Sequence, residues 1–143
     1  MTQIDFYTNV ADRLSTACRI AAKAYSLGRR TLIFCPDSET AGRVDRLLWS
    51  APATGFIPHC TPANPLAGTT PIIIDHAGGE PLCDQVLLNL RDEWPPFFGR
   101  FERLVEIVSL DDEDRRTARE RFKFYRDRGY EIRTHDLNEA AKA

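Results

Sequence analysis

The alternation of short apolar runs with helical repeats is the feature that most constrains how this chain can fold. Two runs, Thr31–Cys35 and Pro71–Asp75, are mostly apolar and too short for a typical helix. Runs of this kind indicate strands that are buried on both faces, as in a parallel sheet. Segments 10–25 and 38–49 instead carry apolar residues at spacings of three and four, the helix period. Strands that alternate with helices predict parallel pairing through crossover connections.

Residues at the ends of these segments predict where the first helix begins and ends. Asn9 is expected to cap it by accepting a backbone N–H, and Gly28 is expected to end it. Thr54–Thr70 has no clear periodicity and is predicted to be a loop with a short strand around Phe56–Ile57. Further strands are expected at residues 4–8, 86–90 (where a helix is the competing prediction), 104–108 and 130–134.

Length and composition indicate one globular domain. A chain of 143 residues, 43% hydrophobic and 28% charged, is ordinary for a single domain. We predict a single α/β domain over residues 1–137, a three-layer sandwich with a mostly parallel central sheet, and a flexible tail over 138–143. The arrangement is Rossmann-like, but the turns at 8–10 and 36–38 hold no glycine. We therefore expect no phosphate-binding loop and no nucleotide.

Several classes of protein are disfavoured by what the sequence lacks. There is no run of about 18 apolar residues, and the first residues lack the basic start and apolar core of a signal peptide. We expect no membrane span and a cytoplasmic location. The four cysteines form no Cys-x-x-Cys pair, the spacing that zinc sites and thiol redox motifs use. Cys18 and Cys35 are expected to be small core residues.

The segment Arg115–Arg128 concentrates seven basic and three aromatic side chains, in a chain of net charge −2. We expect a helix over 111–128, ended by Gly129, on which Arg115, Arg119 and Phe122 fall on successive turns. Phe122 lies at the border of the apolar stripe, where its ring can form the floor of a small exposed pocket. Lys123 follows it directly. Because Arg holds a carboxylate with two hydrogen bonds, the pattern favours a ligand with an apolar end and a carboxylate.

Alternative interpretations of the charged residues remain open. A basic run is often only a solvated helix face, and it also attracts nucleic acid phosphates. The acidic run Asp111–Asp114 at the helix start would repel such a backbone, and it is expected to cap the helix rather than hold a metal. His59 and Cys60 offer a base and a nucleophile. Adjacent residues usually point apart, so a Cys/His-dependent enzyme is the weaker alternative.

Five segments, taken in their order and spacing, resemble one known family. They are Asp5–Tyr7, Gly28–Phe34, Asp45–Trp49, Phe56–His59 and Ala118–Arg126. Together they are similar to the chi subunit of bacterial DNA polymerase III holoenzyme, an accessory subunit of the clamp loader. The resemblance covers nearly the whole chain. Some members of this family have Lys where this chain has Arg115 and Tyr where it has Phe122.

The resemblance implies a non-catalytic accessory protein, with no catalytic residues, cofactor or metal. It implies a 1:1 complex with the psi subunit of the clamp loader, through a surface that includes Trp49 and Phe56. It also implies contact with single-stranded DNA that is indirect, through the single-stranded DNA-binding protein SSB. The acidic C-terminal tail of SSB would be bound by Arg115, Arg119, Phe122 and Lys123.

Overall fold

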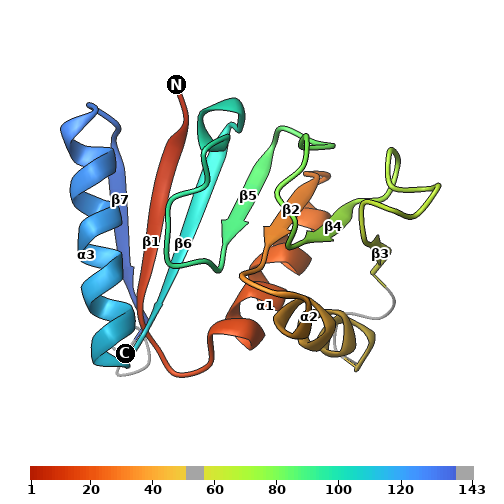
Figure 1. Cartoon of the computed structure of the whole chain (residues 1–143), viewed down its shortest axis with the longest axis horizontal. Helices are drawn as coiled ribbons and strands as arrows, with labels where there is room; N and C mark the ends of the chain where they lie inside the picture. The colour runs from red at the N-terminus through yellow and green to blue at the C-terminus, as the bar shows by residue number, and fades with distance from the viewer. Residues whose placement is uncertain (51–56, 138–143) are drawn as a thin grey trace.

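The computed structural model describes residues 1–50 and 57–137, which have an α/β fold (Figure 1). In these residues seven strands make a single sheet in the order β3-β4-β2-β5-β6-β1-β7, and every pair of neighbours is parallel. The strands are β1 (Gln3–Val10), β2 (Thr31–Phe34), β3 (His59–Cys60), β4 (Ile72–Asp75), β5 (Val86–Asn89), β6 (Arg103–Ser109) and β7 (Ile132–Asp136). The helices are α1 (Arg13–Ser26), α2 (Ser38–Ser50), the short 3₁₀ helix η2 (Phe98–Arg100) and α3 (Asp112–Asp127).

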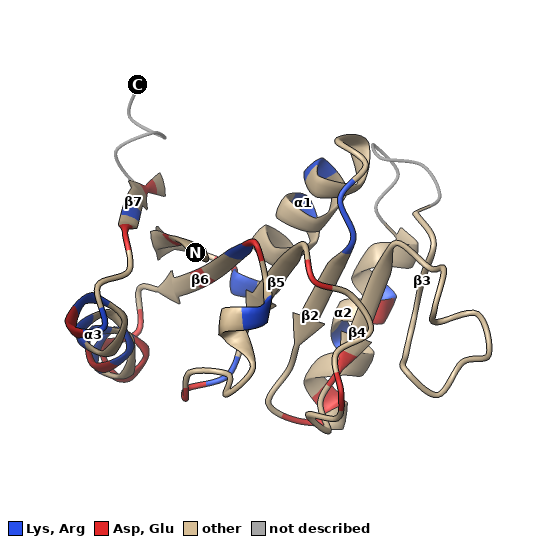
Figure 2. Ribbon diagram, turned by 90° about the horizontal axis from the view of Figure 1, so that it is seen from above, with Lys and Arg blue, Asp and Glu red and all other residues tan. Residues whose placement is uncertain are grey.

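Helices cover both faces of the sheet, so the predicted three-layer α/β architecture is confirmed. α1 and α2 pack on one face, and α3 packs on the other, against β6 and β1 (Figure 2). Alternate residues of a strand point to opposite faces, and Leu32 and Ile33 accordingly belong to two separate apolar clusters. The same holds for Leu87 and Leu88 of β5, which forms a strand rather than the competing helix. The continuous apolar runs therefore reflect burial on both faces.

Asn9 is not the cap of the first helix, so that prediction was wrong. The cap is Asp12, whose carboxylate accepts a hydrogen bond of 3.1 Å from the backbone N–H of Ser15. Asn9 instead continues β1 through an irregular stretch of its pairing with β6 and has a φ of 57°. Asn tolerates this left-handed conformation better than most residues. Gly28 follows the end of α1 with a φ of 73°, as predicted.

Other boundaries differ from the predictions in smaller ways. The short strand expected around Phe56–Ile57 lies at His59–Cys60, and Phe56 is outside the described residues. The predicted tail, 138–143, is also outside them. The strand expected at 130–134 lies at Ile132–Asp136, on the edge of the sheet. Across residues 1–50 and 57–137, every helix is too short or too polar to cross a membrane.

Candidate functional site

The carboxyl ends of β1 and β6 mark the point where the chain changes faces. These two strands are neighbours in the sheet, but β1 leads into α1 on one face and β6 leads into α3 on the other. In parallel α/β sheets, ligands bind in the crevice that opens at such a switch point. On the α3 side, this end of the sheet has a hollow of about 390 Å³, which we call the α3 hollow. Its lining consists of Phe6, Thr8, Asn9, Val108, Arg115, Ala118, Arg119, Phe122 and Thr134.

The acidic run before the basic residues fixes the start of α3. Asp111 caps the helix by accepting a hydrogen bond of 3.1 Å from the backbone N–H of Asp114. The carboxylate of Asp114 accepts one of 2.7 Å from the backbone N–H of Ser109, the last residue of β6. Asp112 and Glu113 add negative charge at the positive end of the helix dipole. The expectation that this run caps the helix is confirmed.

One of the seven basic side chains, Arg121, is a core residue rather than a surface charge. It is 1% exposed, and its Nε lies 3.1 Å from Oε1 of the fully buried Glu106. Tyr125 donates its hydroxyl to the other carboxylate oxygen at 2.6 Å, and the amide of Asn89 donates to both. Burial raises the pKa of Glu106, while the charge of Arg121 and these hydrogen bonds oppose the rise. The group anchors α3 to the sheet.

Three more of the basic side chains have partners elsewhere on the helix surface. Arg116 forms ion pairs with Glu113 and Glu120, one turn to either side. Arg126 lies 3.6 Å from the carboxylate of Asp127. The guanidinium of Arg128 stacks over the ring of Phe124, 3.7 Å from its centre. The remaining cations, Arg115, Arg119 and Lys123, are the three that the sequence predicted for the site.

Arg115 is held in place at the hollow by Asn9. Its Nη2 donates a hydrogen bond of 2.8 Å to Oδ1 of Asn9, and Nδ2 of Asn9 donates one of 2.9 Å to Asp136 on β7. Asn9 therefore bridges the end of β1, the sheet edge and α3. The sequence did not predict this role for Asn9. Its position directly after the β-prone run, in a residue type that tolerates positive φ, is the signal that points to it.

Arg119 and Phe122 form the accessible part of the hollow. Phe122 is half-buried, and its ring packs edge-to-face on the buried ring of Phe6, with centroids 5.3 Å apart. Arg119 is exposed. Within 1–50 and 57–137, neither Arg119 nor Lys123 has a hydrogen-bond or ion-pair partner for its charged group. Lys123 is exposed and does not line the hollow, so three of the four predicted residues come together and the fourth lies beside them.

Trp49 lies on a different part of the molecule, on the helix that packs over β3 and β4. It is in the last turn of α2, with 62% of its surface exposed. Its ring packs edge-to-face on His59, with centroids 5.1 Å apart. The His59 ring is fixed between the carbonyl of Ile57, 2.8 Å from Nδ1, and the carboxylate of Asp45, 3.0 Å from Nε2. Trp49 is therefore an exposed aromatic side chain that packs on a His59 ring whose own position is fixed.

The two residues of the alternative Cys/His site are not brought together. The Nδ1 of His59 faces the Ile57 carbonyl and its Nε2 faces Asp45, and its ring contacts α2 through Trp49. Cys60 instead packs on the apolar cluster of the α3 side. Neighbouring strand residues point to opposite faces, which explains the separation. Cys18 and Cys35 are buried as expected, and burial raises the pKa of their thiols to about 11 and about 12.

Comparison with known proteins gives consistent matches over the length of the chain. The family model described as "DNA polymerase III chi subunit, HolC" matches residues 1–133. The DNA polymerase III subunit chi of Pseudomonas aeruginosa is 34% identical over 143 residues, which cover 96% of this chain and 98% of that protein. Its namesake in Escherichia coli is 34% identical, with coverage of 82% and 80%. That of Haemophilus influenzae is 32% identical, with coverage of 85% for both chains.

Proposed function

Because the chain belongs to the DNA polymerase III chi subunit family of replication accessory proteins, we propose that it links SSB to the clamp loader by binding the acidic C-terminal tail of SSB. The tail site is the hollow beside α3. A second contact, with the psi subunit, holds the protein on the clamp loader in a 1:1 complex. Its role is non-catalytic, it works in the cytoplasm, and its contact with single-stranded DNA is made through SSB.

The observation that carries this proposal is an apolar hollow with a free guanidinium at its rim. Phe122 and Phe6 supply ring surface, and Arg119 has no partner in the described part of the chain. An aromatic residue at the end of a peptide enters the hollow, and its terminal carboxylate meets Arg119. Arginine suits this task because its planar fork makes two parallel hydrogen bonds to one carboxylate.

The neighbouring cations attract the acidic residues that precede the end of the tail. Arg115 is already fixed by Asn9 at 2.8 Å, so little side-chain freedom is lost when it binds an anion. Lys123, the residue after Phe122, is exposed and attracts the acidic residues of the tail through its charge alone. Interactions between exposed charges are screened by salt, so tail affinity falls as ionic strength rises. Many tails held near one clamp loader multiply a modest affinity through effective concentration.

A calorimetric titration with a peptide of the SSB tail tests this site directly. Arg119→Ala is expected to cost about 1.5–3 kcal/mol of binding free energy, the range for a hydrogen bond to a charged group. The matched control is Arg116→Ala, because Arg116 lies on the same helix but is paired with Glu113 and Glu120. Removing the last aromatic residue from the peptide should weaken wild-type binding as well.

The possible results separate recognition from general attraction. Unchanged affinity in a folded Arg119→Ala protein would remove this residue from the site. An equal loss in Arg116→Ala would mean that only the net charge of α3 matters. Tight, steeply salt-dependent binding of bare single-stranded DNA would instead favour a direct nucleic-acid-binding protein. The even mixture of acidic and basic residues around α3 argues against that alternative (Figure 2).

The psi contact is expected at Trp49, and Phe56, outside the described residues, stays a prediction for the same surface. An exposed tryptophan that is held in place by a neighbouring ring, as Trp49 is by His59, is the type of residue that dominates protein interfaces. Trp49→Ala should therefore abolish most co-purification with psi, at low and high salt alike, and leave tail binding intact. Leu110→Ala is a matched control, because Leu110 is a similarly exposed apolar residue elsewhere. Retention of psi by Trp49→Ala would place the contact elsewhere.

A further inference from the structure

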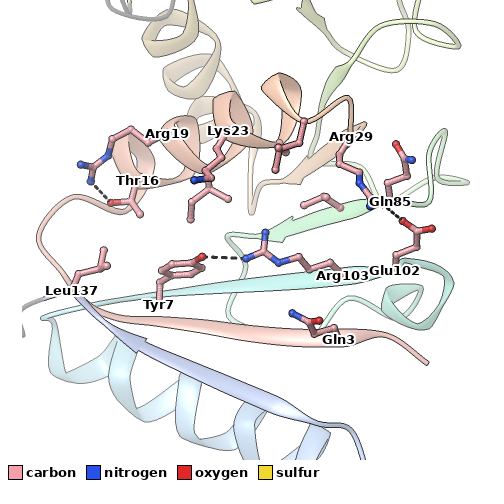
Figure 3. A pocket seen from close by; sticks show the side chains of 14 residues that line it. Gln3, Tyr7, Thr16, Arg19, Lys23, Arg29, Gln85, Glu102, Arg103 and Leu137 are labelled. Atoms are coloured by element: carbon pink, nitrogen blue, oxygen red, sulfur yellow. Dashed lines mark hydrogen bonds and ion pairs between the residues drawn. The ribbon is translucent and has the colours of Figure 1, made fainter. Parts of the chain in front are cut away.

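A second and larger hollow, of about 780 Å³, lies on the other face of the same strands, between α1 and the sheet (Figure 3). We call it the α1 groove. Strands β1, β5 and β6 and the residues next to them supply one wall, and Leu137 lies at one end. α1 and the residue after it supply the other wall through Thr16, Arg19, Ile20, Lys23, Ala24 and Leu27. None of these residues belongs to the α3 hollow or to the Trp49 surface.

The α1 wall has the spacing of a helix face that packs on another helix. Its six positions follow one another at steps of three, one, three, one and three, which form a continuous stripe. This stripe borders the core-facing stripe of Leu14, Ala17, Cys18 and Ala21, and its own Thr16 and Ala24 are buried. Leu27 remains 67% exposed and Ile20 is half-buried. The accessible part of this stripe is therefore its outer edge, formed by Arg19, Ile20, Lys23 and Leu27.

The helix layer formed by α1 and α2 also covers only part of this face of the sheet. α1 packs on β2, β5 and β6, and α2 packs on β3 and β4. On this face, no helix of residues 1–50 and 57–137 lies over β1 and β7 (Figure 2). Among the described residues, the uncovered position is the one directly beside α1, along the groove. A helix placed there would complete the third layer of the sandwich.

The charges around the α1 groove are mostly positive. Arg19 and Lys23 stand on the helix wall and are exposed, and Lys23 has no side-chain partner among the described residues. Arg103 lies opposite, held by Asp5 at 2.8 Å and by the hydroxyl of Tyr7 at 3.1 Å (Figure 3). At the far end Glu102 is neutralised by Arg29 at 2.8 Å. The cations without a carboxylate partner in the described part of the chain, Arg19 and Lys23, therefore stand on the helix wall, and Arg103 on the sheet wall is paired with Asp5.

The length of the groove selects the kind of occupant. From Thr16 to Leu27 the stripe advances about 16 Å, at about 1.5 Å per residue, which is three helical turns. A single phosphate or carboxylate would fill one end and leave the apolar middle wet. We propose that the α1 groove docks an acidic amphipathic α-helix of a partner protein. The helix lays aliphatic side chains on Ile20 and Leu27 and carboxylates on Arg19 and Lys23. This goes beyond the proposed links to SSB and psi and does not depend on them.

The test uses a synthetic helix on the full-length protein. The probe is a 15-residue hydrocarbon-stapled peptide with leucines on one stripe and glutamates on both sides of it. Its carboxyl end is amidated, so it lacks the terminal carboxylate that the α3 hollow is proposed to bind. Titration followed by amide NMR should shift residues 16–27, 85–86 and 102–103. A peptide with lysines in place of the glutamates should bind at least tenfold more weakly.

Paired charge reversals locate the binding. The double variant Arg19→Glu with Lys23→Glu should weaken the acidic peptide at least tenfold, and both side chains are exposed, so the fold should persist. The matched control, Arg43→Glu with Arg46→Glu, changes the same charge at two exposed positions on α2 and should leave this affinity unchanged. Shifts confined to the α3 hollow or to α2, no shifts at millimolar peptide, or equal affinity for the lysine peptide would each overturn the proposal.

Discussion

The α3 hollow and the α1 groove lie on opposite faces of β1 and β6, and their difference follows from which face a helix covers. On the α3 side Ile4 and Phe6 are buried under the helix, which leaves a small hollow at one end. On the α1 side the alternate residues Gln3, Asp5 and Tyr7 face a region that no described helix covers. We propose the end of a peptide as the ligand of the covered face and a whole helix as the ligand of the open face.

The two faces also treat their buried carboxylates differently. Glu106 under α3 is fully buried, with a guanidinium that is 1% exposed. Asp5 on the open face is 1% exposed, but its arginine partners, Arg103 and Arg133, remain 31% and 55% exposed. Within residues 1–50 and 57–137, Glu106 therefore has a single ion-pair partner that is buried with it, whereas Asp5 has two arginine partners that remain accessible to water. Loss of a partner should therefore cost far more under α3.

The largest effect is expected for Arg121→Ala. It leaves the Glu106 carboxylate buried without its ion-pair partner, which costs about 3–5 kcal/mol of the free energy of unfolding. Urea unfolding at neutral pH measures this loss. Replacing both members, as in Glu106→Leu with Arg121→Leu, should cost less than the single change, because no charge is left unpaired. A loss below 1 kcal/mol in Arg121→Ala would mean that Glu106 takes up a proton at little cost.

A smaller effect, about 2 kcal/mol at neutral pH, is expected for Asp5→Asn, since it removes charge-assisted hydrogen bonds. Burial acts to raise the pKa of Asp5, but hydrogen bonds from His135, Arg103 and Gln3 hold it below the usual 3.8. Its folded-state pKa is therefore lower than its unfolded-state pKa. The stabilisation is present above pH 3.8 and is lost as the pH falls through the folded-state value.

Urea unfolding of wild type and Asp5→Asn at pH 7 and near pH 3 checks this sign. The difference between the two proteins should shrink as the pH falls. A constant difference between wild type and Asp5→Asn at both pH values would contradict the assignment.

The architecture was predictable because its causes are local in the sequence. Thr31–Cys35 and Pro71–Asp75 each contain consecutive apolar residues, Leu32–Cys35 and Ile72–Ile74, so they predict buried parallel strands without knowledge of the partners. Helical spacing alone placed Phe122 at the border of the apolar stripe, where the structure has it. Helical spacing did not show that Lys123, the next residue, lies beside the α3 hollow and not in its lining.

The unpredicted features depend on contacts between distant segments. An arginine within a basic run is expected to be a surface charge, and Arg121 is instead buried. Its position, three residues after Ala118 and four before Tyr125, puts it on the buried stripe. The bond from Arg115 to Asn9 joins residues 106 apart in the chain. The α1 groove exists because of where α1 lies on the sheet, and no spacing within α1 encodes that position.

A more modest effect on the α3 hollow is expected for Asn9→Gly. It removes the amide that holds Arg115 but retains a residue that adopts a φ of 57° without strain. Tail affinity should fall about threefold to tenfold, since about 0.5–1.5 kcal/mol is typical of one hydrogen bond. Calorimetry with the tail peptide measures the change. An affinity equal to wild type would show that Arg115 needs no positioning by Asn9.

The smallest effect is expected for Phe122→Tyr, and it separates the wall of the hollow from the core behind it. Phe122 and Phe6 have ring centroids 5.3 Å apart, but Phe122 is half-buried and Phe6 is 2% exposed. A hydroxyl on the ring of Phe122 can reach water, so stability should change by less than about 0.5 kcal/mol and tail affinity by less than about twofold. The same hydroxyl at Phe6 is buried without a partner and should cost about 1–3 kcal/mol of stability. Equal losses in urea unfolding of the two variants would mean that Phe122 is enclosed, and the α3 hollow would then have no accessible aromatic wall.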